Sequence, residues 1–261
     1  MITATIRLVS YAALIYLVLP LAVIVGSSLT TSSFLAFPPQ GVTLAWYGKM
    51  LGDASYVAAF ATSTVLATAA TLIAVLLAVP AALAIARHAF PGRRLLSATL
   101  MSPLILPHVV LGAALLQYGT AIGLTRSFNA LLVGHVVIIM PFVLRAVLPQ
   151  LTDDQRSLEE ASADLGARPL ATFFLVTLPQ IRSGIASGAI FAFISSWINV
   201  ELSIFNTTAE LTTIPVKLFN YVQYTIDPTI AAVSSITILV AAVTIIILDL
   251  TLGLDVLSER R

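Results

Sequence analysis

Long apolar segments dominate the pattern of hydrophobic and polar positions. Because unpaired backbone groups cannot be left in lipid, a helix needs roughly 20 apolar residues to cross the hydrocarbon layer. Six stretches meet this requirement, at about residues 8–28, 56–86, 95–118, 130–148, 183–205 and 229–252. The short-range alternation that is typical of a membrane barrel does not occur. The pattern therefore predicts an all-α bundle of six transmembrane helices, forming a single domain over residues 1–261.

Composition supports a membrane protein. Of all residues, 59% are hydrophobic and only 10% are charged, and the mean hydropathy is +1.01. Such values lie far from those of a soluble domain. The absence of cysteine excludes a disulfide framework and a thiolate metal site. The first stretch is longer than the apolar region of a secretory signal, so we expect it to be retained; a cleaved signal would leave five spans.

Basic residues are unevenly divided between the two sets of connecting segments. One set carries ten of the thirteen, namely Arg7, Arg87, Arg93, Arg94, Arg145, Arg156, Arg168, Arg182, Arg260 and Arg261. The other set carries Lys49, Arg126 and Lys217. Basic residues concentrate on the cytoplasmic side of membrane proteins. We therefore expect both termini and the segment 149–182 to be cytoplasmic.

Prolines stand inside or at the ends of several spans, at Pro20, Pro80, Pro103, Pro107 and Pro141. Each removes a backbone donor and disturbs the carbonyl one turn earlier, which favours a kink. Such kinks suit a protein that opens, although each could also be a packing feature without a role in motion.

The longest cytoplasmic segment, 149–182, has a specific pattern. Asp153 and Asp154 can accept from the free amides at a helix start, and Gly166 suits a left-handed helix end. The face shared by positions 158, 161, 162 and 165 is apolar or small, so either the bundle or a partner protein must hold this short helix. A second apolar segment follows Pro169, and we expect a break at Pro179 where the chain re-enters the membrane.

At this point the residues resemble a known family. Glu160, Ala161, Ser162, Gly166, Val176, Leu178 and Pro179 resemble the EAA loop of permease subunits of binding-protein-dependent ABC importers. Ser162 replaces the second alanine of that pattern, which exchanges one small residue for another. The resemblance implies a type I importer bundle whose loop forms a coupling helix that enters a cleft on a separate ATPase. It assigns docking to Glu160, Ala161 and Gly166, and the turn back toward the pathway to Leu178 and Pro179.

The same resemblance implies partners and a location. They are a paralogous permease subunit, two ATP-binding subunits that bind ATP and magnesium, and a periplasmic substrate-binding protein. The location is the bacterial inner membrane. The chain itself would carry no cofactor, and no binding to nucleic acid is indicated.

Two further segments, 37–51 and 213–236, resemble the C-type permease subunit of spermidine/putrescine importers. That subfamily tends to carry adjacent acids midway along the fifth span, where this chain has Ile198 and Asn199. Glu201 is the nearest acid, and an acid within a span indicates a functional site. The candidate pathway residues are therefore Trp197, Asn199 and Glu201, with helix packing as the alternative for each. The expected solute is polyamine-like, while amino-acid derivatives, phosphonates, thiosulfate and ferric iron remain open.

Motifs of other functions are absent. Neither Lys49 nor Lys217 stands in a G-x-x-x-x-G-K-[ST] loop, so ATP hydrolysis must occur on another chain. The histidines, at positions 88, 108 and 135, show no zinc-protease spacing and are expected to be structural. A secondary transporter or channel that works without an ATPase is the main alternative. It would require more intramembrane charge than Arg145, Glu201 and Asp249 supply. A membrane-embedded enzyme would need a catalytic set that the sequence lacks.

Overall fold

The computed structural model describes residues 2–252, and the chain divides into two compact units. Unit 1 combines residues up to Phe60 with Lys217–Val243, and unit 2 combines Ala61–Val216 with the described residues from Thr244 on. Two of the basic residues used for orientation, Arg260 and Arg261, lie outside the described residues, as does the side chain of Asp249.

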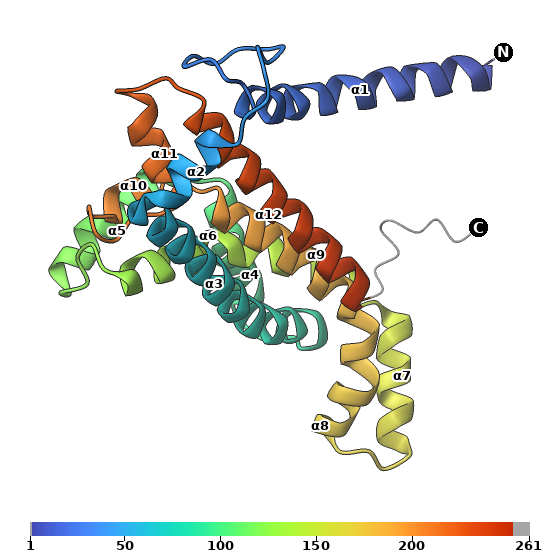
Figure 1. The fold of residues 1–261 in the computed structure, drawn as a ribbon. Helices are drawn as coiled ribbons and strands as arrows, with labels where there is room; N and C mark the ends of the chain where they lie inside the picture. Colours follow the sequence, from blue (N-terminus) through green and yellow to red (C-terminus); the bar gives the residue numbers. More distant parts are fainter. Residues whose placement is uncertain (1, 253–261) are drawn as a thin grey trace. The chain divides into compact units, whose positions relative to one another are not determined.

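Helices make up both units (Figure 1). Unit 1 contains α1 (Ile2–Ser28), α2 (Ala45–Gly52), the start of α3 (Ala54–Arg87), the end of α11 (Ile214–Val222) and most of α12 (Thr229–Leu252). Unit 2 contains the rest of α3, then α4 (Arg93–Met101), η1 (Ser102–Leu104), α5 (His108–Ala121), α6 (Phe128–Val147), η2 (Leu148–Gln150), α7 (Asp153–Asp164), α8 (Pro169–Thr172), η3 (Phe173–Thr177), α9 (Leu178–Trp197) and α10 (Ser203–Asn206).

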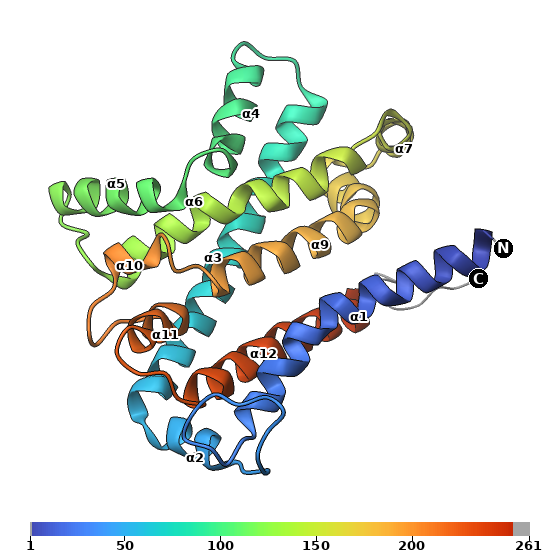
Figure 2. The ribbon, with the colours of Figure 1, turned by 90° about the horizontal axis from the view of Figure 1, so that it is seen from above.

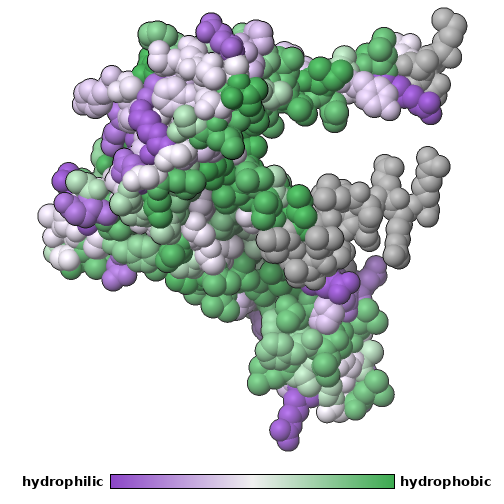
Figure 3. Space-filling view, viewed as in Figure 1, coloured by the Kyte–Doolittle hydropathy of each residue, from purple (hydrophilic) through white to green (hydrophobic). Residues whose placement is uncertain are grey.

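The prediction of an all-α membrane protein is confirmed. Among the described residues, 5 helices are long and apolar enough to cross a membrane, and a bent helix pair brings the number up to 6. The helix α1 is one of them and exposes apolar side chains along most of its length, drawn in green in Figure 3. Helices α1, α3 and α6 continue through Pro20, Pro80 and Pro141.

The third predicted span differs from the single kinked helix that its hydropathy and prolines indicate. Residues Arg93–Leu104 and His108–Ala121 form two helices that meet at 106°. Pro107 has an extended backbone and directly precedes α5, and a proline disfavours helical geometry in the residue before it. The prolines therefore produce a break that is much sharper than a kink.

The predicted break at Pro179 is wrong. A continuous apolar helical stretch runs from Pro169 to Trp197, and Pro179 lies in the first turn of α9. The preceding turns, Phe173–Thr177, are π-helical. A wider turn accommodates a residue that cannot donate a backbone hydrogen bond, so the helix absorbs the proline without ending. The fifth span also ends earlier than expected, at Trp197.

Close packing of α6 against α9 forms the centre of unit 2, and the two helices lie side by side in Figure 2. A Cβ atom on Gly184 would stand 2.6 Å from the carbonyl oxygen of Ala146, and one on Gly188 would stand 2.8 Å from the Cα of Val143. Only glycine permits so close an approach, which is a common device between membrane helices. The core continues onto a stripe of fully buried small residues on α3, at Ala70, Ala74, Ala78 and Ala82.

Asp227 joins three helices of unit 1. Its carboxylate accepts from Lys49 Nζ of α2 at 2.8 Å and from the hydroxyl of Tyr221 of α11 at 2.9 Å. It also accepts from the backbone N–H of Thr229 at 2.9 Å, at the start of α12. This contact spans 178 positions between Lys49 and Asp227, so no local sequence pattern indicates it.

Protonation of Asp227 should therefore weaken unit 1. Burial raises the pKa of Asp227, but hydrogen bonds from Lys49, Thr229 and Tyr221 outweigh burial and hold the pKa below its ordinary value. The hydrogen bond to Asp227 likewise raises the pKa of Lys49. A carboxylate with a lowered folded pKa stabilises fully above its unfolded pKa, and this stabilisation is lost as the pH falls through the folded pKa. For Lys49 the stabilisation is present below its unfolded pKa and is lost as the pH rises through the raised folded pKa.

We expect Asp227→Asn to lower the free energy of unfolding at neutral pH by about 1.5 to 3 kcal/mol, the range for hydrogen bonds to charged groups. The variant should also lose part of the acid dependence that the wild type shows between about pH 5 and pH 3. Thermal unfolding in detergent across this range measures both effects. Parallel pH profiles for the two proteins would contradict the role of Asp227.

Candidate functional site

The helix α7 begins where its first residues can satisfy the free amides. Thr152 is the N-cap, and its hydroxyl accepts from the backbone N–H of Gln155. Asp153 and Asp154 lie in the first turn, where their charges favour the positive end of the helix. The helix over 153–164 agrees with the prediction from the two aspartates, but its N-cap is Thr152, which was not predicted.

Gly166 ends α7 as predicted. Its φ of 86° lies in the left-handed region, which side chains disfavour. The N–H of Gly166 donates to the carbonyl of Ala163 at 2.9 Å, and the N–H of Ala167 donates to that of Ser162 at 3.1 Å. These two bonds form a Schellman motif, which satisfies carbonyls that would otherwise lack partners. Both ends of α7 are thus fixed by the chain itself.

One face of α7 is open. Leu158 is 54% exposed and Leu165 is 90% exposed, and Ala161 between them is exposed as well. We call these three residues the docking face. No residue of α7 is buried, and the surface of this region carries both apolar and hydrophilic residues at the lower right of Figure 3. Three of the four positions of the apolar face predicted from the sequence are therefore not covered by the described part of this chain, while the fourth, Ser162, is half-buried.

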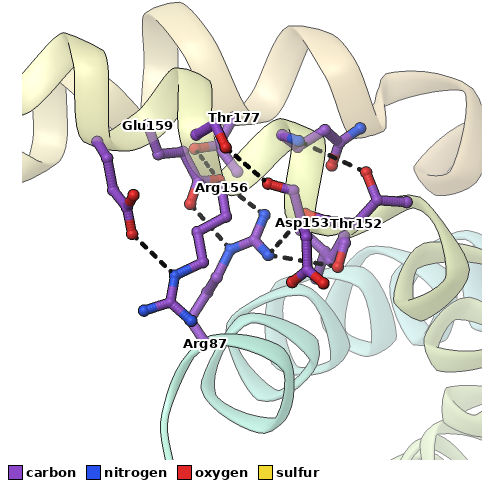
Figure 4. Close-up of polar contacts among 10 residues, drawn as sticks. Arg87, Thr152, Asp153, Arg156, Glu159 and Thr177 are labelled. Carbon is purple, nitrogen blue, oxygen red and sulfur yellow. Dashed lines mark hydrogen bonds and ion pairs between the residues drawn. The ribbon is translucent and has the colours of Figure 1, made fainter.

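Another side of α7 is held through Glu159, as Figure 4 shows. Arg87, the last residue of α3, donates from Nε to one carboxylate oxygen of Glu159 at 2.8 Å and from Nη2 to the other at 3.2 Å. Thr177 donates its hydroxyl to the same carboxylate at 2.9 Å. Arg87 also donates to the carbonyls of Leu151 and Thr152, which directly precede the helix.

Glu160, the residue singled out from the sequence, has a different environment. It accepts from Arg156 one turn earlier at 3.0 Å, and the side chains of this pair are 65% and 53% exposed. Glu160 therefore remains accessible to a partner, whereas Glu159 is occupied within the chain. The sequence could not show which of the two adjacent glutamates is bound within the chain, because the partner of Glu159 is 72 positions away.

The other residues of the loop pattern lie around α8 and the start of α9. Ser162 Oγ is 3.2 Å from Thr172 Oγ1, so the serine that replaces alanine joins α7 to α8. Leu178 and Pro179 form the first turn of α9. A cleft of about 530 Å³ opens between the end of α3, α7 and α8, and its lining includes Arg87, His88, Arg156, Glu159 and Glu160.

A second cavity, of about 310 Å³, brings together two of the three candidate pathway residues. Asn199 and Glu201 line it together with His108 from the start of α5. His108 Nδ1 lies 3.8 Å from the Glu201 carboxylate and 3.4 Å from Asn199 Nδ2. Trp197 is instead buried and stacks on Phe193, with ring centroids 5.7 Å apart. His108, which was predicted to be structural, thus lines the cavity.

A buried histidine holds the non-helical residues between α9 and α10, which line part of this cavity. His135 of α6 is fully buried, and its two ring nitrogens lie 2.7 Å from Ser196 Oγ and 2.9 Å from Ser203 Oγ. These serines stand on opposite sides of the non-helical residues between α9 and α10. Asn199 Oδ1 also accepts from the N–H of Leu202 at 3.0 Å. His135 therefore has the structural role that was predicted for it.

Comparison with known proteins identifies the family of this chain. Residues 75–257 match the family described as "Binding-protein-dependent transport system inner membrane component". The chain is 32% identical over 222 residues to the putrescine transport system permease protein PotI of Escherichia coli K12, covering 82% of this chain and 78% of that protein. It is 27% identical over 231 residues to the spermidine/putrescine transport system permease protein PotC of the same strain, covering 88% and 87%.

The fold is also similar to a chain of a solved structure, that of a bacterial alginate ABC transporter in complex with alginate pentasaccharide-bound periplasmic protein. The TM-score is 0.70 and the identity is 15%, and the likeness covers 95% of this chain and 92% of the other. The family match includes the whole of α7 and both cavities. The chain belongs to the inner-membrane components of binding-protein-dependent transport systems, the permease subunits of ABC importers.

Proposed function

We propose that this permease works by receiving force from a separate ATP-hydrolysing subunit through α7. The observation that supports the proposal is the docking face, which is apolar, exposed and carried by a helix whose two ends are fixed. A protein partner would remove this face from water, which is favourable in proportion to the apolar area buried. Within the EAA pattern, Glu160, Ala161, Ser162 and Gly166 would form the docking element, and Leu178 and Pro179 would lead toward the pathway.

The proposed assembly contains four further polypeptides. They are a paralogous permease, two ATP-binding subunits that hold ATP and magnesium, and a periplasmic protein that delivers the solute. Both termini and α7 would face the cytoplasm, because ten of the thirteen basic residues belong to that side in the six-span topology. The periplasmic protein bound in the related alginate transporter supports a binding protein for this importer.

The proposed mechanism is alternating access. Closure of the ATPase pair on ATP would displace α7, and the bundle would then open toward the periplasm to receive the solute. Hydrolysis would reset the assembly. Each ligand shifts the equilibrium only by its difference in affinity for the two states.

The proposed solute is a polyamine or a similar small cation. The two relatives are named for putrescine and for spermidine and putrescine. In the cavity lined by His108, Asn199 and Glu201, the carboxylate of Glu201 would attract an ammonium group. The sequence departs from the paired acids of the subfamily, so a single carboxylate would carry the charge of this site.

Reconstitution in proteoliposomes tests the proposal. Uptake of labelled putrescine should require the ATP-binding subunits, ATP and the binding protein together. Uptake that persists without an ATPase, driven by an ion gradient, would instead support the secondary transporter or channel. Uptake of other solutes but not of polyamines would refute the proposed substrate class.

Neutralising Glu201 should weaken transport of a cation without affecting assembly. The Glu201 side chain is 60% exposed, and an ion pair in such an environment contributes about 1 kcal/mol or less. We therefore expect Glu201→Gln to raise the KM for putrescine uptake by up to about fivefold, since 1.4 kcal/mol corresponds to a factor of ten. Glu210→Gln, at another exposed acid of unit 2, is the matched control. Equal KM values in the two variants would contradict the role of Glu201.

A further inference from the structure

We propose that Arg87 and Glu159 are positioning residues that fasten α7 to the ends of α3 and α9, so that a displacement of α7 moves both transmembrane helices. The inference rests on the proposed docking of α7 to an ATPase, but it concerns a separate step. Docking determines whether force reaches α7. The contacts of Arg87 and Glu159 determine whether that force reaches the pathway.

The geometry of the pair restricts movement of α7 relative to α3. Two nitrogens of Arg87 contact the two oxygens of Glu159, at 2.8 and 3.2 Å. A two-point contact between planar groups fixes orientation as well as distance. The remaining terminal nitrogen of Arg87 donates to the carbonyls of Leu151 and Thr152 at 3.3 and 3.1 Å. Arg87 therefore holds the middle of α7 and the residues before it at the same time.

Thr177 extends the connection to the fifth span. Its hydroxyl donates to Glu159 Oε1, and it is the last residue of the π-helical segment that continues directly into α9. The contact between Ser162 and Thr172 adds a second link between α7 and the same segment. One carboxylate thus joins the end of α3, the middle of α7 and the start of α9.

Burial distinguishes this pair from its neighbour on the same helix. The side chains of Arg87 and Glu159 are only 12% and 17% exposed, whereas those of Arg156 and Glu160 are 53% and 65% exposed. Screening by water and salt weakens exposed ion pairs, while partly buried and hydrogen-bonded pairs are screened much less. The pair that the sequence pattern does not include is therefore the one able to transmit force.

The first experiment separates docking from transmission. In the full importer, Glu159→Gln and Arg87→Gln should still bind the ATP-binding subunits, with an affinity within about twofold of wild type because neither residue belongs to the docking face. ATP should still be hydrolysed, but the amount of solute taken up per ATP should fall about fivefold or more, since a coupling free energy of 1 to 3 kcal/mol corresponds to factors of 5 to 150. Arg93→Gln removes an exposed cation at the start of α4 and should retain the wild-type ratio.

A covalent link provides the second experiment and guards against simple misfolding. The chain has no cysteine, so Arg87→Cys combined with Glu159→Cys introduces the only thiols of this subunit. Without a link, the double variant should show the reduced ratio of solute to ATP. A short bifunctional methanethiosulfonate reagent that joins the two thiols should restore the ratio, because the proposed contact stays closed throughout the transport cycle.

Three outcomes would overturn the inference. They are a wild-type ratio in Glu159→Gln, loss of ATPase binding in that variant, which would place Glu159 in docking, and failure of the covalent link to restore transport. Failure of the wild-type chain to bind any ATP-binding subunit would refute the proposed function itself, so the two failures can be distinguished.

Discussion

Replacement of Leu158 and Leu165 by aspartate should reduce the affinity of the permease for its ATP-binding subunits by at least about 100-fold. Central residues of an interface each contribute about 2 kcal/mol or more when truncated, and a charge at such a position adds a desolvation cost. The side chains are 54% and 90% exposed in the chain alone, so the substitutions should leave its fold intact. Co-purification of tagged ATP-binding subunits, with thermal unfolding of the isolated permease, measures both properties.

The matched control places the same charges on exposed leucines elsewhere. Leu44 and Leu51 are 67% and 61% exposed and belong to unit 1, near and within α2. Aspartate at these positions should leave ATPase binding at the wild-type level. Equal loss of binding in both pairs, or wild-type binding by the Leu158 and Leu165 variant, would show that the docking face has another role.

Gly166→Val should have the next largest effect, through the backbone alone. A Cβ at this position meets no atom within 4 Å, but the φ of 86° is strained for any side chain with a branched Cβ. A strain of about 1 to 3 kcal/mol would open the Schellman motif at the end of α7. ATPase binding and ATP-dependent uptake should therefore both fall by about tenfold or more, as measured in the co-purification and proteoliposome assays.

Gly166→Asn provides the control for this variant. Asparagine fills the same open space but tolerates the left-handed conformation, so it should retain most of the binding. If the valine and asparagine variants behave alike, the conformation of Gly166 is not what presents the docking face.

Local patterns explain how much of the fold could be predicted. Runs of apolar residues identified the spans because a lipid environment imposes a minimum helix length. The extent of α7 followed from Asp153, Asp154 and Gly166, since each acts on backbone groups within a few residues. The effect of proline was less predictable. The chain bends by 106° between Leu104 and His108 but continues through a π-helical segment before Pro179, so the presence of a proline did not by itself predict which of the two would occur.

The contacts that position the sites could not be predicted in the same way. Arg87 meets Glu159, His135 meets two serines, and Lys49 meets Asp227, in each case across 60 or more positions of the chain. Such pairings depend on which helices lie side by side, and the pattern of residues along one sequence does not indicate this. The EAA pattern thus indicated the exposed Glu160, whereas the adjacent Glu159, which holds the helix in place, emerged only from the structure.

Thiol labelling at position 161 tests the central claim most directly. Ala161 lies at the centre of the docking face, and Ala161→Cys introduces a single thiol into a chain that has no native cysteine. In membrane vesicles of known orientation, a membrane-impermeant maleimide should label this thiol from the cytoplasmic side only, and the ATP-binding subunits should protect it. Labelling from the periplasmic side, or equal labelling with and without those subunits, would contradict the proposal that α7 receives force from a separate ATPase.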